Sequence, residues 1–352
     1  MAANDKSYNE QVNKDIIIKM REILKDLPRF CSVFFNGIDA TTLPRTKLGY
    51  AYDLRIFFNY IIENNPKYQN TKMHDLPLEL LDELNTLDLE EYMNYLKLYE
   101  KDNIEYTNNE QGLKRKFSAL RAMYNYFFNN EMIKDNPAVK VRMPKIHEKD
   151  IVRLEPDEIV KLLDEVESGD SLTSKQKQYH NKTKVRDLAL LTLLLGTGLR
   201  VSECVGIDMD DINFDICGVK VHRKGGKESV VYFGEEVLEA LLSYLEERKH
   251  IIPAEGHENA FFLSSQQKRI SVRTVEKLVN KYASLVTSIK HITPHKLRST
   301  YGTTLYQETG DIYLVADVLG HSDVNTTRRH YAALEDERRR RARNAVTLRE
   351  KK

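Results

Sequence analysis

Apolar residues in the first part of this 352-residue chain recur at the spacing of an amphipathic helix, and this periodicity limits the fold more than any other feature. Four stretches show it, at residues 13–27, 46–62, 88–99 and 110–129. Breakers divide or bound these stretches: Pro44, Pro66, Pro77 and Pro137. We therefore predict a small all-α domain over residues 1–140.

The pattern changes after a charged segment. Residues 141–150 contain a proline and have no apolar period, so we predict an exposed linker over residues 141–154. The second predicted domain, residues 155–352, combines helices, one of them apolar at 188–195, with short strands at 211–214, 218–223 and 229–233. Gly225 and Gly226 suit the turn of a β-hairpin, and the polar stretch 168–184 predicts a loop. The expected fold class is mainly α with a small β-sheet.

Composition excludes several classes of protein. A hydrophobic content of 41% is enough for packed cores, whereas the longest apolar run, residues 188–195, is too short to span a bilayer. The first ten residues are polar and do not read as a secretion signal. The three cysteines, Cys31, Cys204 and Cys217, support neither a disulfide framework nor a zinc site. We therefore expect a cytoplasmic protein without a membrane partner or a bound metal.

The charge balance first argues against a nucleic-acid partner, because 54 basic residues face 53 acidic ones. The charges are unevenly placed, however. Acidic residues dominate between Asp75 and Glu110, and basic residues follow through the helix at 110–129 into the linker. The candidate DNA-binding residues on that helix are Lys114, Arg115, Lys116 and Arg121. Such a stripe can follow phosphates along a duplex; the alternative is an ordinary solvated helix face.

Four motifs carry candidate chemistry. They are Gly198-Leu199-Arg200 after the apolar helix, Lys224 in the hairpin turn, His295 with Arg298, and Gly320-His321 followed by Tyr331. Each has an ordinary interpretation alone, such as a helix cap, a solubilising lysine or one of nineteen tyrosines. Together they supply cations, imidazoles and a phenol without metal-ligand spacing or a serine nucleophile motif. That set suits a phosphodiester handled without a metal.

In this order the motifs resemble those of the tyrosine site-specific recombinases and integrases, and within them the Xer-like proteins. The length and the polar stretch before Lys184 are most similar to the longer Xer recombinases that act as a single protein type. The resemblance implies a two-domain, C-shaped DNA clamp with an N-terminal core-binding domain and a C-terminal catalytic domain. It also implies a homotetramer on two double-stranded recombination sites, a Holliday-junction intermediate, and no metal, nucleotide or other cofactor.

The resemblance also implies a role for each catalytic candidate. Arg200 and Arg298 would bind the non-bridging oxygens of the scissile phosphate, and Lys224 would protonate the departing 5′ oxygen. His295 and His321 would hydrogen-bond the phosphate and assist proton movement, while Tyr331 would attack phosphorus and form a 3′-phosphotyrosyl bond. The chain departs from the family twice: Tyr331 follows His321 by one residue more than in many relatives, and Ser299 replaces a frequent histidine.

Two further protein classes remain as alternatives. One is a catalytically silent, sequence-specific DNA-binding protein with the same fold, and the other is a type IB topoisomerase, which shares the chemistry. Within the recombinase class, the sequence leaves two biological roles open. These are chromosome-dimer resolution and the integration or excision of a mobile element.

Overall fold

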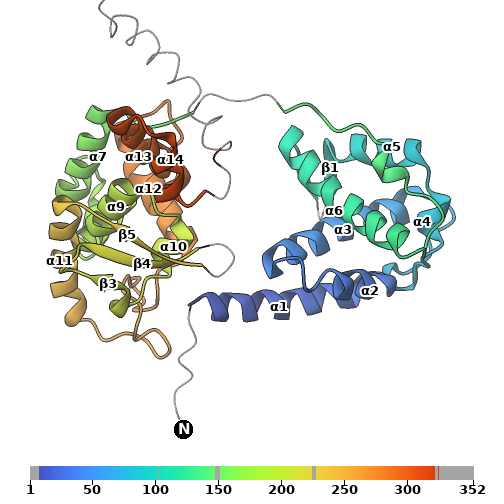
Figure 1. Cartoon of the computed structure of the whole chain (residues 1–352), viewed down its shortest axis with the longest axis horizontal. Helices are drawn as coiled ribbons and strands as arrows, with labels where there is room; N and C mark the ends of the chain where they lie inside the picture. The colour runs from blue at the N-terminus through green and yellow to red at the C-terminus, as the bar shows by residue number, and fades with distance from the viewer. Residues whose placement is uncertain (1–7, 102, 147–150, 224–226, 322–323, 325–352) are drawn as a thin grey trace, which may run out of the picture. The chain divides into compact units, whose positions relative to one another are not determined.

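The computed structural model describes residues 8–101, 103–146, 151–223, 227–321 and 324. The chain divides into two compact units, Met1–Glu148 and Lys149–Lys352 (Figure 1). The division falls inside the segment for which we predict a linker. Val141, the first residue of that segment, is nevertheless only 2% exposed and belongs to the core of the N-terminal unit. The start of the predicted linker is therefore packed, and this part of the prediction is wrong.

The N-terminal unit is mainly helical. Its elements are α1 (Tyr8–Asp26), α2 (Phe30–Gly37), α3 (Pro44–Asn64), α4 (Leu80–Glu83), α5 (Thr86–Tyr95), β1 (Leu98–Lys101), β2 (Ile104–Thr107) and α6 (Glu110–Asn129), with short 3-10 helices at Met73–Asp75 and Pro137–Val139. Helix α3 packs against both α1 and α6. Phe57 and Phe58 of α3 and Phe117 and Phe127 of α6 are almost completely buried. The predicted amphipathic period thus corresponds to faces that share one core.

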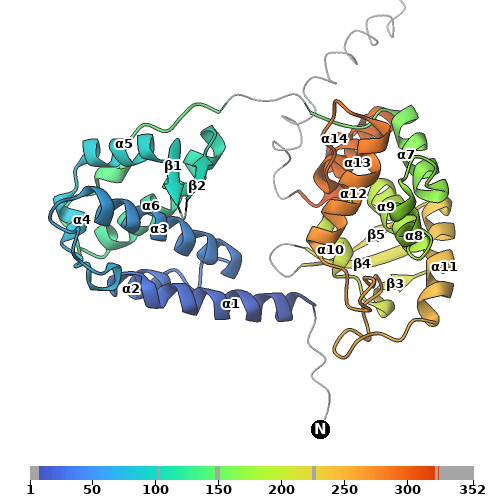
Figure 2. The same cartoon turned by 180° about the vertical axis from the view of Figure 1, so that it is seen from behind.

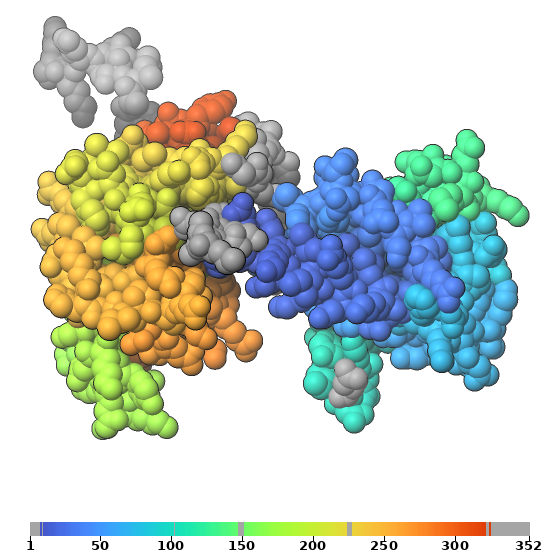
Figure 3. Space-filling model, turned by 90° about the horizontal axis from the view of Figure 1, so that it is seen from below, coloured from blue at the N-terminus to red at the C-terminus, as the bar shows by residue number. Residues whose placement is uncertain are grey.

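One predicted helix is partly wrong. The apolar period over 88–99 continues past the end of α5 at Tyr95, but Leu98–Lys101 forms an antiparallel hairpin with Ile104–Thr107. Asn103, with φ of 58°, lies in the turn, where asparagine tolerates the left-handed region better than most residues. Tyr99 and Tyr106 face each other across the hairpin with ring centroids 5.4 Å apart. The hairpin protrudes from the unit in the space-filling view (Figure 3).

The C-terminal unit combines helices with one small sheet. Its elements are α7 (Pro156–Ser168), α8 (Ser174–His180), α9 (Lys184–Thr197), α10 (Val201–Val205), a 3-10 turn (Met209–Asp211), β3 (Ile212–Asn213), β4 (Gly218–His222), β5 (Glu228–Tyr232), α11 (Glu235–Lys249), α12 (Val272–Val286), α13 (Pro294–Thr309) and α14 (Ile312–Leu319). The sheet is antiparallel, in the order β3-β4-β5. The predicted hairpin between β4 and β5 is confirmed, with His222 paired to Glu228 at its end.

Helix α9 is the centre of this unit. It packs against α7, α11 and α13, as both ribbon views show (Figures 1 and 2). Leu190, Leu191, Leu193 and Leu194 are completely buried, which explains why the sequence is apolar on every side of this helix. Gly198, where α9 ends, therefore lies next to the core of the unit, and it introduces the first site motif.

The stretch 168–184 is not the loop that we predict from its polarity. It contains α8, which is capped by Thr173 with Gln176 in a reciprocal capping box. Its last residue, His180, is 1% exposed, and its Nδ1 atom lies 3.0 Å from the Tyr282 hydroxyl of α12. The buried His180 thus attaches α8 to the core, while the other side chains of the helix are polar and exposed. The fold class itself, mainly α with small antiparallel sheets, is confirmed.

Candidate active site

Arg298 joins the ends of two helices. It lies in the second turn of α13, which begins at Pro294, and it is only 5% exposed. Its Nη1 atom donates to the Gly198 carbonyl oxygen at 2.7 Å, and its Nη2 atom donates to the Leu319 carbonyl oxygen. Because Gly198 ends α9 and Leu319 ends α14, one guanidinium group fixes both helix ends.

Gly198 must be glycine for two reasons. Its φ is 63°, in the left-handed region that a helix C-cap favours. A Cβ atom here would also lie 2.5 Å from Tyr301 Cδ1 and 2.9 Å from Leu319 Cδ2. The close approach of α13 and α14 to this turn therefore depends on the missing side chain, and it brings the Gly198 carbonyl within reach of Arg298.

Arg200 is the N-cap residue of α10, and a buried carboxylate sets its direction. Its Nη1 atom lies 2.8 Å from Glu203 Oε1, while its Nη2 atom donates to the Gly320 carbonyl oxygen at 3.1 Å. Glu203 Oε2 accepts the Arg200 backbone N–H at 2.8 Å, so the same carboxylate binds both the backbone and the side chain of Arg200. The Arg200 side chain is 35% exposed and that of Glu203 only 5%. The buried Glu203 carboxylate therefore orients the Arg200 guanidinium group, which is still partly accessible to solvent.

His321 follows the tight turn that ends α14. Gly320 has φ of 61°, and the N–H groups of Gly320 and His321 donate to the carbonyls of Asp317 and Ala316 at 2.8 and 2.9 Å. This is the Schellman pattern of a helix C-terminus. Because Leu319 and Gly320 are the residues whose carbonyls accept from Arg298 and Arg200, the turn holds His321 beside both arginines.

His295 lies in the first turn of α13, three residues before Arg298. Desolvation by the surrounding protein lowers its pKa, and the positive charges of Arg298, Lys296 and Arg200 lower it further. The neutral imidazole is therefore favoured at pH 7, so this ring can both accept and donate a hydrogen bond.

Arg200, the pair His295 and Arg298, and His321 thus come together in one region, although they lie on three separate segments of the chain. The other two catalytic candidates, Lys224 and Tyr331, lie outside the described residues. Two guanidinium groups near the His295 imidazole can stabilise a phosphate that gains negative charge during reaction.

Comparisons with known proteins agree with this geometry. A model of the phage integrase family matches residues 152–338, which is more than half of the chain. Tyrosine recombinase XerC of Caldanaerobacter subterraneus subsp. tengcongensis is 32% identical over 326 residues, which cover 90% of this chain and 85% of the relative. Tyrosine recombinase XerS of Streptococcus mutans serotype c is 30% identical over 359 residues, with 93% and 98% covered. The chain belongs to the Xer-type tyrosine recombinases.

Solved structures show the same fold as this recombinase. XerH recombinase, bound to a palindromic difH substrate in a post-cleavage complex, aligns with a TM-score of 0.64 at 18% identity, covering 93% of this chain and 86% of XerH. The Tn1549 transposon integrase, in complex with circular intermediate DNA, gives a TM-score of 0.62 at 21% identity, with 86% and 94% covered. The predicted family and enzyme class are confirmed, and the comparisons do not favour a catalytically silent DNA-binding protein.

The four DNA-binding candidates on α6 of the recombinase have different surroundings. Lys114 is exposed. Arg115 binds the buried Asp53 with both terminal nitrogens, at 2.5 and 2.8 Å, and the Nζ atom of Lys116 lies 3.8 Å from the same carboxylate. Arg121 instead donates to the carbonyls of Ala138 and Val141, at 2.9 and 2.5 Å. The stripe is therefore partly an internal network, and Lys114 and Arg115 are its exposed cations.

Two further residues of the site had no role assigned from the sequence. Glu203 stands three residues after Arg200, and this i,i+3 pairing of opposite charges is a readable signal for an oriented arginine. Arg223 donates to the carbonyls of Asp317 and Val318, at 3.1 and 2.8 Å. Nothing in the local sequence predicts that contact, because its acceptors lie more than ninety residues away.

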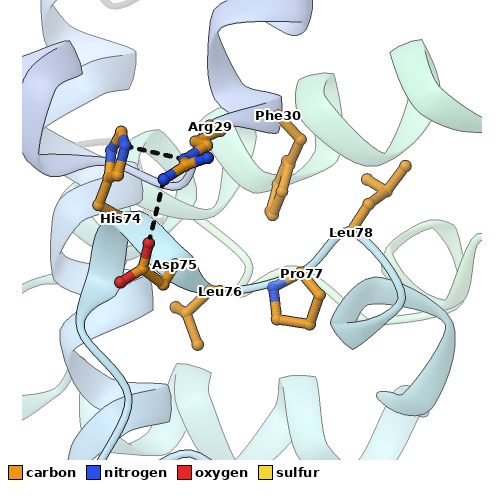
Figure 4. Close-up of a pocket in the computed structure, with 7 residues that line it drawn as sticks. All are labelled: Arg29, Phe30, His74, Asp75, Leu76, Pro77 and Leu78. Atoms are coloured by element: carbon orange, nitrogen blue, oxygen red, sulfur yellow. Dashed lines mark hydrogen bonds and ion pairs between the residues drawn. The ribbon is translucent and has the colours of Figure 1, made fainter.

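Among the described residues, no group of three or more histidine, cysteine or acidic side chains could hold a metal ion. No helix in this part of the chain is long and apolar enough to cross a membrane. A surface pocket in the N-terminal unit is lined by Arg29, His74, Asp75 and apolar neighbours, with Arg29 Nε donating to His74 Nε2 at 3.0 Å (Figure 4). None of the predicted site residues lines this pocket.

Proposed function

We propose that this recombinase cleaves and rejoins DNA strands through a phosphotyrosyl intermediate at the site built around Arg200 and Arg298. The observation that carries the proposal is the pair of guanidinium groups bound to the adjacent carbonyls of Leu319 and Gly320, with His321 as the next residue. This arrangement fixes two planar donor groups, whose geometry matches the non-bridging oxygens of a phosphodiester.

In the proposed step, the Tyr331 phenol oxygen attacks phosphorus and the bond from phosphorus to the 5′ oxygen breaks. The phenol proton passes to a neighbouring base, for which His295 and His321 are the candidates, and Lys224 gives a proton to the departing 5′ oxygen. The product is a 3′-phosphotyrosyl bond and a free 5′-hydroxyl. Attack by the 5′-hydroxyl of another strand reverses the step, so one ester replaces another and no nucleotide cofactor is needed.

Preorganised charge accounts for the expected acceleration. A phenol with an ordinary pKa of about 10 is a weak nucleophile at neutral pH, so the transition state depends on donors already in place. The removal of one such donor typically costs about 10²- to 10³-fold in rate. Arg298 is buried with two carbonyl partners and Arg200 has a buried carboxylate behind it, so neither must reorganise when phosphate arrives.

We propose double-stranded DNA recombination sites as the partner. Of the structural neighbours of the recombinase, XerH was solved bound to a difH substrate and the Tn1549 integrase in complex with circular intermediate DNA. By this proposal four copies assemble on two sites in the cytoplasm, the two units of each copy clamp the duplex, and strand exchange passes through a Holliday junction. Lys114 and Arg115 of α6 are exposed cations suited to phosphate contacts.

For the biological role, we propose the resolution of chromosome dimers, because the relatives found are Xer-type recombinases over nearly the whole chain. A role in mobile-element integration or excision predicts instead that the recombination sites lie at the two ends of an element. Mapping the bound sites on the genome of the source organism distinguishes the two roles.

A nicked suicide DNA substrate tests the chemistry. The nick lets the strand beyond the cleavage point diffuse away, so a covalent adduct between protein and DNA accumulates. We expect the adduct with the wild-type chain and none with Tyr331→Phe. Tyr313→Phe is the matched control, because Tyr313 is 71% exposed on α14 and has no proposed role. An adduct that persists in Tyr331→Phe would refute the nucleophile assignment.

A further inference from the structure

We propose that Arg223 is a positioning residue of the active site, and this inference rests on the proposed function. Arg223 directly follows β4, and its backbone N–H donates to the Lys227 carbonyl at 2.8 Å across the β4–β5 turn. Its guanidinium group reaches the end of α14, where it binds the carbonyls of Asp317 and Val318. Arg223 therefore ties the hairpin to the turn that carries His321.

The contact completes a pattern at the C-terminus of α14. The last carbonyls of a helix have no partner within the helix. Here the carbonyls of residues 317 and 318 accept from Arg223, that of 319 from Arg298, and that of 320 from Arg200. Three arginines thus cap four successive carbonyls, and their charge also complements the negative end of the helix dipole.

The packing around Arg223 is close. Its Nε atom is buried, and its two terminal nitrogens lie 3.1 and 2.8 Å from their acceptors. A Cβ atom built on Gly320 would overlap the Arg223 guanidinium group, so glycine at this position is required by the arginine as well as by its φ of 61°. The Arg223 side chain therefore packs directly against the turn at Gly320 that precedes His321.

The consequence for the reaction follows from this geometry. If Arg223 is shortened, the Val318 carbonyl loses its Arg223 donor, the Asp317 carbonyl keeps only the Gly320 N–H, and the hairpin is released from the turn. The turn then holds His321 less tightly, while Arg200 and Arg298 keep their own contacts. A displacement of about 1 Å in a reacting group can cost about 10²-fold in rate. Arg223 itself touches no reacting atom, so it acts through His321.

A double-mutant cycle on the full-length chain tests the inference with single-turnover cleavage of the suicide substrate. We expect Arg223→Ala to reduce the rate by about 10²-fold in the wild-type background. In a His321→Ala background the same change is expected to cost less than about threefold, because residues that act through one group are not additive. Arg223→Lys is expected to recover part of the lost rate, because one ammonium group can serve one of the two carbonyls.

Arg248→Ala is the matched control for a purely structural arginine. Arg248 also donates to backbone carbonyls of the same unit, those of Ile251, Glu258 and Ala260, none of which belongs to the site. We expect it to lower the melting temperature without changing the cleavage rate of the folded protein.

Two results would overturn the inference: wild-type cleavage by folded Arg223→Ala, or an equal loss of rate in both backgrounds. If Arg223→Ala does not fold, Arg223→Lys takes its place in the same cycle, with the same two refuting results. A wild-type chain that forms no adduct contradicts the proposed function instead, so the two failures are distinguishable.

Discussion

Replacing Glu203 by glutamine changes the group that orients Arg200 and leaves the arginine itself in place. The wild-type carboxylate accepts two hydrogen bonds at 2.8 Å, one from the Arg200 backbone N–H and one from Nη1. Glutamine has nearly the same shape but only one acceptor oxygen, and its amide group is a donor. It can keep one of the two bonds, and it opposes the other with a second donor.

The magnitude follows from those contacts. A hydrogen bond to a charged group contributes about 1.5–3 kcal/mol. Because the Arg200 side chain is 35% exposed, solvent screening reduces the loss toward about 1 kcal/mol. For a unit of this size, that corresponds to a fall in melting temperature of about 2–4 °C. We expect cleavage to fall by about tenfold, less than the 10²-fold of a full misplacement, because the Gly320 carbonyl still holds Nη2.

Thermal unfolding and single-turnover cleavage of the suicide substrate measure the two effects. Glu246→Gln is the matched control, because Glu246 pairs with Lys249 at the same i,i+3 spacing, with both side chains exposed. That change should lower the melting temperature by less than about 1 °C and leave cleavage unaltered. If Glu203→Gln lowers the melting temperature but cleaves at the wild-type rate, the orientation of Arg200 by Glu203 has no part in the reaction.

Three further predictions concern stability and DNA binding. Arg121→Ala should destabilise the N-terminal unit by about 1–3 kcal/mol in urea unfolding, because the carbonyls of Ala138 and Val141 lose their donor; an unchanged unfolding midpoint contradicts this. Burial, followed by the charge of Lys281, lowers the pKa of His180 below its ordinary value of 6.5. The unfolded state then binds the proton more tightly, so the free energy of unfolding should be full above pH 6.5 and fall below it. In urea unfolding between pH 7.5 and 5, His180→Asn should flatten this dependence. An unchanged slope of the unfolding free energy against pH in His180→Asn contradicts the prediction. Lys114→Ala should reduce the slope of log DNA affinity against log salt concentration by about one unit. The control Lys161→Ala, which removes an exposed cation paired with Asp157, should leave this slope unchanged. Equal slopes for Lys114→Ala and the wild-type chain would exclude Lys114 as a phosphate contact.

The sequence predicts the helices and turns that depend on the local pattern of residues. The period of α3 and α6 and the glycine-rich turn between β4 and β5 are visible without a structure because each depends on neighbouring residues. The hairpin at Leu98–Lys101 was missed because its apolar residues continue the helical period of α5. Helix α8 was missed because one buried histidine, His180, secures an otherwise polar segment.

The same limit applies to the site. Arg200, His295, Arg298 and His321 were predicted from motifs, and the structure brings them together. Their carbonyl partners were not predictable, because Arg200 reaches Gly320 across 120 positions and Arg298 reaches Gly198 across 100. Arg223 has no motif of its own, and only the folded chain brings it to α14. The α6 stripe shows the converse case, in which cations that look free in the sequence are partly held by Asp53 and by backbone carbonyls.

The central claim is that Tyr331 carries the DNA strand during recombination, and the covalent bond itself can be located. The adduct trapped with the suicide substrate is digested with protease and nuclease, and the peptide that retains a nucleotide is sequenced by mass spectrometry. We predict a single modified residue, Tyr331, joined to the 3′-phosphate of the cleaved strand. A nucleotide on another residue, or a bond to the 5′-phosphate, would contradict the proposed mechanism.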